Sequence, residues 1–450
     1  MMHEAIKHPP WSPGSWRGRE AVQQPVYDSA EHVANVTRSL SELPPLVAVG
    51  EIERLRAELA EAAEGRRFLL HGGDCAERFR DCRASVLTRL LQVLLQMSMV
   101  LTYATRKSVT RIGRIAGQYA KPRSHAQETV AGRSLPVYRG DLINDWAATP
   151  EARRPDPARM LQGYYHAAAS LNFIRALIEG GFADLHHPER WDLDFIGQSR
   201  HREEYRKVVD AITDAVCFMD TIGAADAAER LRRIAFYTSH EALLLPYEEA
   251  MTRTDSAGAT YNLAAHYLWL GYRTCALDGA HVEYLRGIQN PIAVKVGPNT
   301  NAETLVALLR ALDPDRTPGR MTLITRFGAD KAGPLLPPLV WAVRQARHPV
   351  LWCCDPMHGN TEMLEDGRKT RRMEAIFSEL EQSFAVHADL GSCLGGVHFE
   401  LTGEAVTECV GGCGGVDPGG LHERYDTACD PRMNGVQALE LAFLIARLLR

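Results

Sequence analysis

The stretch from residue 292 to residue 356 repeats one pattern three times. It reads IAVKVGP at 292–298, TLITR at 322–326 and VLWCCDP at 350–356, so each apolar run ends in a polar, glycine-rich or proline-rich cluster. Short apolar runs bounded in this way are typical of strands that are buried on both faces. Segments with helical character follow the runs, at 302–312, 337–346 and 373–387. Strands that alternate with helices predict parallel pairing within one sheet.

Five further runs of the same kind extend the pattern over most of the chain. They lie at 68–70 before His71, 111–116 before Gly117, 234–237 before Thr238, 267–270 before Gly271 and 397–401 before Thr402. Eight parallel strands are the number that closes a (β/α)8 TIM barrel, and this α/β fold is our prediction. An open, doubly wound sheet is the alternative. In a barrel the active site lies at the C-terminal ends of the strands, where the unusual residues of this sequence fall.

Two regions lie outside the repeating pattern. Residues 1–65 are predicted to form an N-terminal extension, in which an irregular arm rich in proline, serine and tryptophan precedes an amphipathic helix at 51–63. Residues 66–450 would form the catalytic barrel. A helical insertion of about three helices, at about 145–233, interrupts the barrel between its second and third strands. A long insertion of this kind is a place for an interface or a regulatory pocket.

Composition and charge exclude several functional classes. The 450 residues are 45% hydrophobic with a formal net charge of −5, so the chain can bury a large core and has no basic field for nucleic acid. Residues 1–16 lack the apolar core of a secretory signal. Polar residues interrupt the apolar segment 86–101, which predicts a buried helix and not a membrane span. Ten cysteines without an export signal favour a reducing compartment, and we expect a cytoplasmic protein.

Four clusters of metal-ligating residues fall at or after predicted strand ends. The clusters are GGDCAE at 72–77, DPMHGN at 355–360, HFE at 398–400 and CDPR at 429–432. Together they supply a thiolate, an imidazole and two carboxylates. Two carboxylates suit an open catalytic site for a divalent metal better than a closed structural zinc site, and Mn²⁺, Co²⁺, Fe²⁺ and Zn²⁺ all stay open. The pair Cys409 and Cys413 is the weaker metal candidate, because no second pair of matching spacing accompanies it.

Cations also gather at the strand ends. The segment 114–124 reads RIAGQYAKPRS, and its arginines and serine suit a phosphate group. Arg273 and Arg326 follow later strands, and Lys295 interrupts an apolar strand, so its side chain should point into a buried or catalytic space. Several cationic strand ends around one metal indicate substrates with several negative charges, such as sugar phosphates or phosphoenolpyruvate. Walker-type and dinucleotide-binding glycine motifs are absent from the sequence.

The segment TSHEA at 238–242 is ambiguous. It could hold a loop, support neighbouring site residues, or cap a helix through Ser239. We favour a structural role.

Taken together, these motifs resemble those of the type II 3-deoxy-D-arabino-heptulosonate 7-phosphate (DAHP) synthases. The resemblance runs in order from about residue 68 to the C-terminus. It is carried by GGDCAE at 72–77, RIAGQYAKPRS at 114–124, YRGD at 138–141, SHEA at 239–242, KVGPN at 295–299, CDPMHGN at 354–360, TGE at 402–404 and ACDPR at 428–432.

The resemblance implies a role for each matching position. The metal ligands would be Cys75, His358, Glu400 and Asp430. Phosphoenolpyruvate would contact Arg114, Tyr272, Arg273, Lys295 and Arg326, and erythrose 4-phosphate would contact Lys121, Pro122, Arg123 and Ser124. Lys121, Cys75 and His358 would be the catalytic residues. The implied cofactor is a divalent metal ion; Mn²⁺ and Co²⁺ are favoured, and Zn²⁺ and Fe²⁺ are the alternatives.

The implied reaction joins phosphoenolpyruvate, erythrose 4-phosphate and water to give DAHP and phosphate, the first step of the shikimate pathway. Members of the family often form homo-oligomers, and some are assisted by chorismate mutase, so both partners are expected here. No nucleic acid or membrane partner is expected.

One position departs from the family pattern. The segment WLGYRT at 269–274 has Tyr272 where the family usually has an acidic residue. The departure leaves open the same chemistry on an amino-sugar phosphate. A non-catalytic homologue that binds metabolites or a partner enzyme is the alternative from another class. We also hypothesise that Cys429, next to the predicted ligand Asp430, forms an inactivating disulfide with Cys75 on oxidation; a buried, inert thiol is the alternative.

Overall fold

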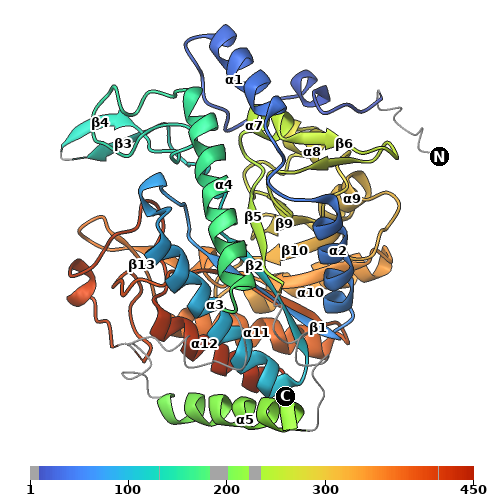
Figure 1. Cartoon of the computed structure of the whole chain (residues 1–450), viewed down its shortest axis with the longest axis vertical. Helices are drawn as coiled ribbons and strands as arrows, with labels where there is room; N and C mark the ends of the chain where they lie inside the picture. The colour runs from blue at the N-terminus through green and yellow to red at the C-terminus, as the bar shows by residue number, and fades with distance from the viewer. Residues whose placement is uncertain (1–9, 131, 183–200, 222–234, 414) are drawn as a thin grey trace.

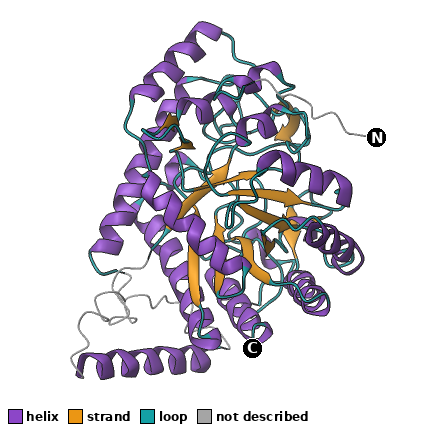
Figure 2. Cartoon of the chain, turned by 90° about the vertical axis from the view of Figure 1, so that its right-hand side faces the viewer, coloured by secondary structure: helices purple, strands orange, loops and turns teal. Residues whose placement is uncertain are grey.

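Eight parallel strands form a closed barrel at the centre of the molecule (Figures 1 and 2). The computed structural model describes residues 10–130, 132–182, 201–221, 235–413 and 415–450. The strands follow one another around the barrel in chain order, and the last pairs with the first. They are β1 (Arg67–Gly73), β2 (Ser108–Arg114), β5 (Tyr237–Glu241), β8 (Tyr267–Leu270), β9 (Ile292–Val296), β10 (Met321–Thr325), β11 (Val350–Cys354) and β14 (Leu394–Glu400). The predicted (β/α)8 barrel is confirmed.

The third strand differs from the prediction. We expected it at 234–237, but β5 spans Tyr237–Glu241, and residue 234 lies outside the described residues. Four of its five residues are polar, so no apolar run marks it. All five are buried, and most of their polar groups find partners inside the protein, although His240 Nδ1 and Glu241 Oε1 have no hydrogen-bond partner among the described residues. For example, Ser239 Oγ donates to the backbone oxygen of Gly113 at 2.9 Å.

Helices surround the barrel, one or more after each strand (Figure 2). They are α3 (Ala84–Thr105), α4 (Ala158–Glu179), α5 (Arg202–Thr221), α7 (Leu245–Ala250), α8 (Ala280–Leu285), α9 (Ala302–Leu312), α10 (Ala332–Gln345), α11 (Met373–Asp389) and α12 (Gly435–Leu448). Short 3-10 helices lie at Ser15–Gly18, Phe79–Asp81, His358–Asn360 and Gly420–His422.

Helix α9 shows why these segments are helical. Leu305, Leu308, Leu309 and Leu312 form one buried stripe at helical spacing, and the side chain of Asn301 caps the first turn. Helix α10 begins at Ala332, earlier than the predicted start at residue 337, and contains two prolines. The packing of its buried first turns outweighs the hydrogen bonds that the prolines remove.

The N-terminal segment closes one end of the barrel. Helix α2 (Val49–Ala63) contains the predicted apolar stripe, and its Leu55 and Leu59 are fully buried against inward-facing strand residues such as Leu69. Glu58 of the same helix accepts a hydrogen bond from the Tyr237 hydroxyl at 2.9 Å. The arm before it was expected to be irregular, but it contains helix α1 (Ala30–Glu42), which Ser29 caps. Because α2 fills the N-terminal end, the opposite end is open to ligands.

The insertion between the second and third barrel strands begins with a hairpin that was not predicted, β3 (Gln127–Val130) with β4 (Arg133–Pro136). Helices α4 and α5 follow, and residues 183–200 and 222–234 of the insertion lie outside the described residues. The described part of the chain contains two further hairpins: β6 (Thr252–Thr254) with β7 (Thr260–Asn262), and β12 (Thr361–Met363) with β13 (Lys369–Arg371).

Helix α3 contains the apolar segment 86–101. By length and composition this helix could cross a membrane, but 67% of its most apolar stretch of 18 residues is buried inside the protein. It packs between the barrel and α12. The helix is therefore part of the core, as the sequence predicted.

Candidate active site

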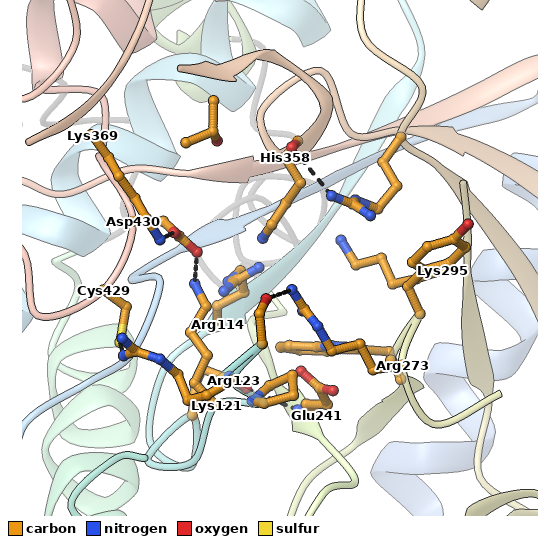
Figure 3. A pocket seen from close by; sticks show the side chains of 18 residues that line it. Arg114, Lys121, Arg123, Glu241, Arg273, Lys295, His358, Lys369, Cys429 and Asp430 are labelled. Carbon is orange, nitrogen blue, oxygen red and sulfur yellow. Dashed lines mark hydrogen bonds and ion pairs between the residues drawn. The ribbon is translucent and has the colours of Figure 1, made fainter. Parts of the chain in front are cut away.

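A polar cavity lies at the C-terminal end of the barrel strands (Figure 3). Eleven of the predicted site residues line it: Arg114, Lys121, Pro122, Arg123, Ser124, Tyr272, Arg273, Lys295, Arg326, His358 and Asp430. The other two, Cys75 and Glu400, are fully buried behind the lining. Further lining residues are Gln118, Glu241, Trp269, Gly271, Thr361, Lys369 and Cys429.

The loop that carries the basic segment is shaped by one buried carboxylate. Glu77 accepts hydrogen bonds from the backbone N–H groups of Ala116, Gly117 and Gln118, at 2.9, 3.0 and 2.7 Å. These bonds support the left-handed backbone of Ala116, whose φ is 60°. Burial raises the pKa of Glu77 to about 7. The loop after β2 therefore turns sharply and directs Lys121 into the cavity.

Two lysines neutralise the acidic side of the cavity. Lys121 Nζ lies 2.5 Å from Asp430 Oδ2 and 3.2 Å from Glu400 Oε1. Lys369 Nζ lies 2.8 Å from the other carboxylate oxygen of Asp430. Burial by itself would lower the pKa of Lys121, but Asp430, Cys75 and Glu400 raise it above its ordinary value. Lys121 therefore stays protonated and can donate to a ligand oxygen.

A buried carboxylate joins a cavity lysine to the predicted histidine ligand. Asp355 Oδ2 accepts from Lys295 Nζ at 2.5 Å and from His358 Nδ1 at 2.7 Å. Burial lowers the pKa of Lys295 to about 8, although Asp355 opposes that shift. Asp355 itself has a pKa well below its usual range, because the charges of His358 and Lys295 outweigh burial. Lys295 is thus a buried cation that faces the cavity, as its place between two valines predicted.

Three side chains form a group with metal-ligating geometry. One ligand atom from each of His358, Glu400 and Asp430 lies within 4.8 Å of the others. His358 Nε2 lies 3.1 Å from Glu400 Oε1, while its Nδ1 is held by Asp355. A carboxylate on the second ring nitrogen is the usual arrangement behind a metal-ligating histidine. The donor set therefore fits a divalent cation.

The predicted thiolate ligand lies beside this group. Cys75 Sγ accepts from the Asp430 backbone N–H at 3.4 Å. Burial by itself would raise the pKa of Cys75, but a hydrogen bond with Cys429 and the charge of Lys121 lower it to about 7. The two cysteines of the disulfide hypothesis are thus neighbours, and both are free thiols.

Arg114 lies beneath the cavity and is almost completely enclosed by acceptors. Its Nε donates to the Asp74 oxygen at 2.8 Å, and its Nη2 donates to the Cys75 oxygen at 3.0 Å and to Glu400 Oε1 at 3.1 Å. Its Nη1 lies 2.6 Å from His398 Nε2. Four of its five N–H groups meet acceptors in this way. The second Nη1–H is the donor that Arg114 can offer to a ligand.

Tyr272 lies among the cations at the mouth of the cavity. The Arg326 guanidinium carbon is 5.3 Å from the centre of its ring, and its hydroxyl accepts from the Asn299 backbone N–H at 2.9 Å. A Cβ on Gly297 would lie 2.8 Å from this ring, so the close approach requires glycine. Tyr272 therefore contributes its side chain, and not only its backbone, to the cavity.

The two predicted substrate subsites adjoin. Arg273, predicted for phosphoenolpyruvate, donates to the Ser124 hydroxyl, predicted for erythrose 4-phosphate, at 2.6 Å (Figure 3). Arg326 donates to the His358 backbone oxygen at 3.2 Å, and its buried Nε has no hydrogen-bond partner among the described residues. That Nε is a second donor of the site without a protein partner.

Sequence reasoning missed several residues of the site. Lys369 and Arg371 come from the β12–β13 hairpin, for which the sequence had no strand signal. Arg371 is completely buried, and its Nη2 lies 2.8 Å from Glu400 Oε2. Asp355 was part of a quoted motif, and its position three residues before His358 could have identified it. Glu241 was part of the ambiguous segment 238–242 and lines the cavity.

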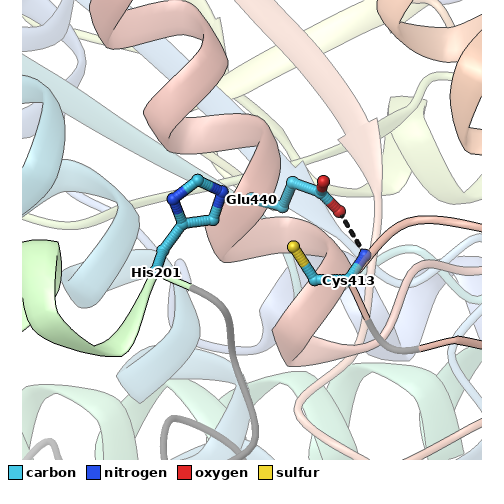
Figure 4. A group of neighbouring side chains, drawn as sticks. All are labelled: His201, Cys413 and Glu440. Carbon is cyan, nitrogen blue, oxygen red and sulfur yellow. Dashed lines mark hydrogen bonds between the residues drawn. The ribbon is translucent and has the colours of Figure 1, made fainter.

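A second group of metal-ligating side chains lies outside the barrel (Figure 4). His201 at the start of α5, Cys413 and Glu440 of α12 have ligand atoms within 4.8 Å of one another. The Cys413 backbone N–H donates to Glu440 Oε2 at 2.6 Å, and His201 Nδ1 is bonded to Glu204 at 2.9 Å. The group does not contain Cys409, so it is not the cysteine pair considered from the sequence.

A (β/α)8 barrel whose mouth combines cations with a divalent-metal donor set defines an enzyme that acts on small anionic substrates. The profile of the Class-II DAHP synthetase family matches residues 11–446. The chain therefore belongs to this family of transferases.

Three relatives match nearly the whole chain. A protein of Neurospora crassa named phospho-2-dehydro-3-deoxyheptonate aldolase is 47% identical over 97% of this chain and 94% of its own length. A protein of the same name from Streptomyces coelicolor is 46% identical over 99% of this chain and 98% of its own. Phospho-2-dehydro-3-deoxyheptonate aldolase AroG of Mycolicibacterium smegmatis is 45% identical over 96% of this chain and 93% of its own length.

Proposed function

We propose that this enzyme condenses phosphoenolpyruvate with erythrose 4-phosphate and water to give DAHP and phosphate. The observation that carries the proposal is the cavity itself, in which seven arginine and lysine side chains surround His358 and Asp430. Two phosphorylated substrates, one of which also has a carboxylate, need such an excess of positive charge. The names of the relatives agree with this reaction.

Phosphoenolpyruvate is proposed to bind the cations at the base and one wall of the cavity. Lys295 provides a buried positive charge, and Arg114 and Arg326 each have an N–H group without a protein acceptor that the substrate would accept from. Arg273 and Tyr272 complete this part of the wall. Such preset donors fix the orientation of a carboxylate and a phosphate before the reaction begins.

Erythrose 4-phosphate is proposed to bind along the loop after β2. Arg123 and Ser124 would contact its phosphate, and Pro122 stiffens the loop between them and Lys121. The Arg123 guanidinium is held in place by the Tyr138 backbone oxygen at 3.0 Å and by Glu128 at 3.2 Å. The aldehyde end would then lie near Lys121 and the acidic group.

Cys75, His358, Glu400 and Asp430 would hold the divalent ion, with Mn²⁺ or Co²⁺ as the proposed species and Zn²⁺ or Fe²⁺ next. When bound, the ion supplies Lewis-acid polarisation of an aldehyde oxygen. The protein side chains prepare for it: Asp355 keeps the proton on His358 Nδ1 and so leaves the Nε2 lone pair available.

The proposed reaction forms one carbon–carbon bond. C3 of phosphoenolpyruvate attacks the aldehyde carbon, and Lys121 donates a proton or hydrogen bond to the aldehyde oxygen. Water then adds at C2, and the bond between C2 and the phosphate oxygen breaks to release phosphate. Throughout, Arg114, Lys295 and Arg326 hold the charged groups so that the reacting carbons stay close.

The test is an assay of phosphoenolpyruvate consumption with erythrose 4-phosphate, with EDTA and then with added Mn²⁺ or Co²⁺. We expect activity that EDTA removes and the metal restores. His358→Ala should abolish metal-dependent phosphate release, because it removes one of the proposed ligands. Unchanged turnover of that variant would remove this site from the mechanism.

Tyr272 is the reason to include a second aldose in the assay. Its side chain lines the cavity at a position where the family usually has an acidic residue. The departure therefore keeps an amino-sugar phosphate as the alternative substrate. We propose erythrose 4-phosphate because the names of the relatives agree with it, and we expect the amino analogue to react more slowly.

We place the reaction at the start of the shikimate pathway, which supplies aromatic amino acids or secondary metabolites, and in the cytoplasm. The nine described cysteines are all free, which supports a reducing compartment. A homo-oligomer, and assistance by chorismate mutase, are proposed from the family resemblance. Light scattering with and without chorismate mutase tests both partners.

A further inference from the structure

A chain of four hydrogen bonds runs beneath the cavity, from Arg114 to the backbone of its own strand. Arg114 Nη1 lies 2.6 Å from His398 Nε2, and His398 Nδ1 lies 2.8 Å from His71 Nδ1. His71 Nε2 lies 2.8 Å from Ser239 Oγ, which donates to the Gly113 oxygen at 2.9 Å. The two histidines and the serine are fully buried, and Arg114 is 2% exposed.

The position of every proton in this chain follows from its first member. A guanidinium can only donate, so His398 Nε2 must be the acceptor and has no hydrogen. The hydrogen of a neutral His398 is then on Nδ1, and it is donated to His71 Nδ1. That leaves His71 with its hydrogen on Nε2, where it is donated to Ser239 Oγ.

Ser239 fixes the direction of the chain at its other end. Its hydroxyl hydrogen is directed at the Gly113 oxygen, so only its lone pairs face His71. If His71 took the opposite tautomer, His398 would have to accept at Nδ1 and would present an N–H to Arg114. Two donors would then meet at 2.6 Å, which is repulsive in a buried site. Burial also lowers the pKa of His71 well below its ordinary value, which agrees with a neutral ring.

We propose that His398, His71 and Ser239 act as positioning residues that hold the Arg114 guanidinium in one orientation for phosphoenolpyruvate. The chain fixes one Nη1–H on His398 and thereby directs the other toward the cavity. Trp269, whose ring centre is 5.0 Å from the guanidinium carbon, limits the remaining freedom of the side chain. The inference rests on the proposed function only in taking phosphoenolpyruvate as the ligand of Arg114.

Two substitutions of one histidine separate this role from simple packing. His398→Gln places an amide oxygen near the position of Nε2 and so keeps the acceptor for Arg114. His398→Asn places its amide near Nδ1, so it keeps a partner for His71 but leaves Arg114 without its acceptor. Each variant therefore removes one bond of the chain, and only the second removes the bond to Arg114.

The measurement is the dissociation constant of phosphoenolpyruvate by titration calorimetry on the metal-loaded enzyme without aldose. A hydrogen bond to a charged group is worth about tenfold to a hundredfold in affinity. We expect His398→Asn to weaken phosphoenolpyruvate binding by about tenfold or more, and His398→Gln by less than about threefold. The KM for erythrose 4-phosphate and the Mn²⁺ affinity should stay within about threefold in both. Ser239→Ala should also weaken phosphoenolpyruvate binding, but by less than His398→Asn does.

The result that overturns the inference is a folded His398→Asn protein with unchanged affinity for phosphoenolpyruvate. Equal losses in the two variants, in step with equal losses of melting temperature, would also overturn it, since His398 would then only fill space. Failure of the proposed function is a different result: the unsubstituted enzyme itself would not bind phosphoenolpyruvate.

Discussion

Asp355→Asn keeps the shape of a buried side chain and removes its charge. In the native protein Asp355 accepts four hydrogen bonds. Lys295 Nζ and His358 Nδ1 donate to Oδ2 at 2.5 and 2.7 Å, and the backbone N–H groups of Met357 and His358 donate to Oδ1 at 3.0 and 3.2 Å. The asparagine oxygen can still accept the two backbone bonds. Its NH₂ group then faces the lysine and the histidine, which are both donors.

The substitution should weaken the binding of both the metal and the substrate. An amide donor beside His358 favours the tautomer with its hydrogen on Nε2, the nitrogen proposed for the metal. Loss of such a partner typically weakens metal binding about 10- to 100-fold, which corresponds to about 1.4–2.8 kcal/mol. Lys295 loses the carboxylate that opposes the effect of burial, so its pKa falls below about 8 and part of its positive charge is lost near neutral pH. The KM for phosphoenolpyruvate should therefore rise as well.

The assay is a titration of EDTA-treated enzyme with Mn²⁺, followed by activity and by calorimetry. Asp313→Asn is the matched control, because Asp313 is also buried and accepts from a histidine, His348 Nε2, at 3.1 Å, outside the cavity. It should lower the melting temperature without changing the Mn²⁺ affinity. A folded Asp355→Asn enzyme with native Mn²⁺ affinity and native KM for phosphoenolpyruvate would refute the reasoning.

Three further predictions use the cations and thiols of the cavity. Because the pKa of Lys295 is about 8, kcat/KM for phosphoenolpyruvate should fall as pH rises through 8 and the ammonium loses its charge; a flat profile from pH 7 to 9 would contradict this. Metal-free enzyme oxidised in air should form a Cys75–Cys429 disulfide and lose activity until it is reduced, whereas the Cys429→Ser variant should keep its activity under the same treatment. If mass spectrometry of the oxidised enzyme finds no disulfide-linked peptides, the disulfide hypothesis is wrong. Tyr272→Leu should raise the KM for phosphoenolpyruvate about two- to fivefold, because Arg326 loses the ring beside it. Tyr272→Phe keeps a ring and should raise the KM less. Equal KM values for the two variants would show that the ring does not matter.

Several elements could be predicted to within a residue from the sequence. The runs 267–270 and 292–296 coincide with β8 and β9, and the segment 302–312 coincides with α9. These segments are recognisable because strands buried on both faces need uninterrupted apolar residues, whereas a helix that buries one face needs them at helical spacing. Lys295 was informative for the same reason, since a cation inside an apolar run requires a special environment.

The sequence by itself determined the number and order of the barrel strands, the apolar core and the residues that carry charge at the strand ends. Only the tertiary structure decided which of those residues meet. His71 and His398 are 327 positions apart, and the partners of Arg114 lie up to 286 positions away from it. Strand β5, whose residues are mostly polar, is a strand because the barrel supplies partners such as His71 for its side chains. Local patterns record only how a segment is buried, and hydrogen bonds between distant polar groups leave no periodic trace in the sequence.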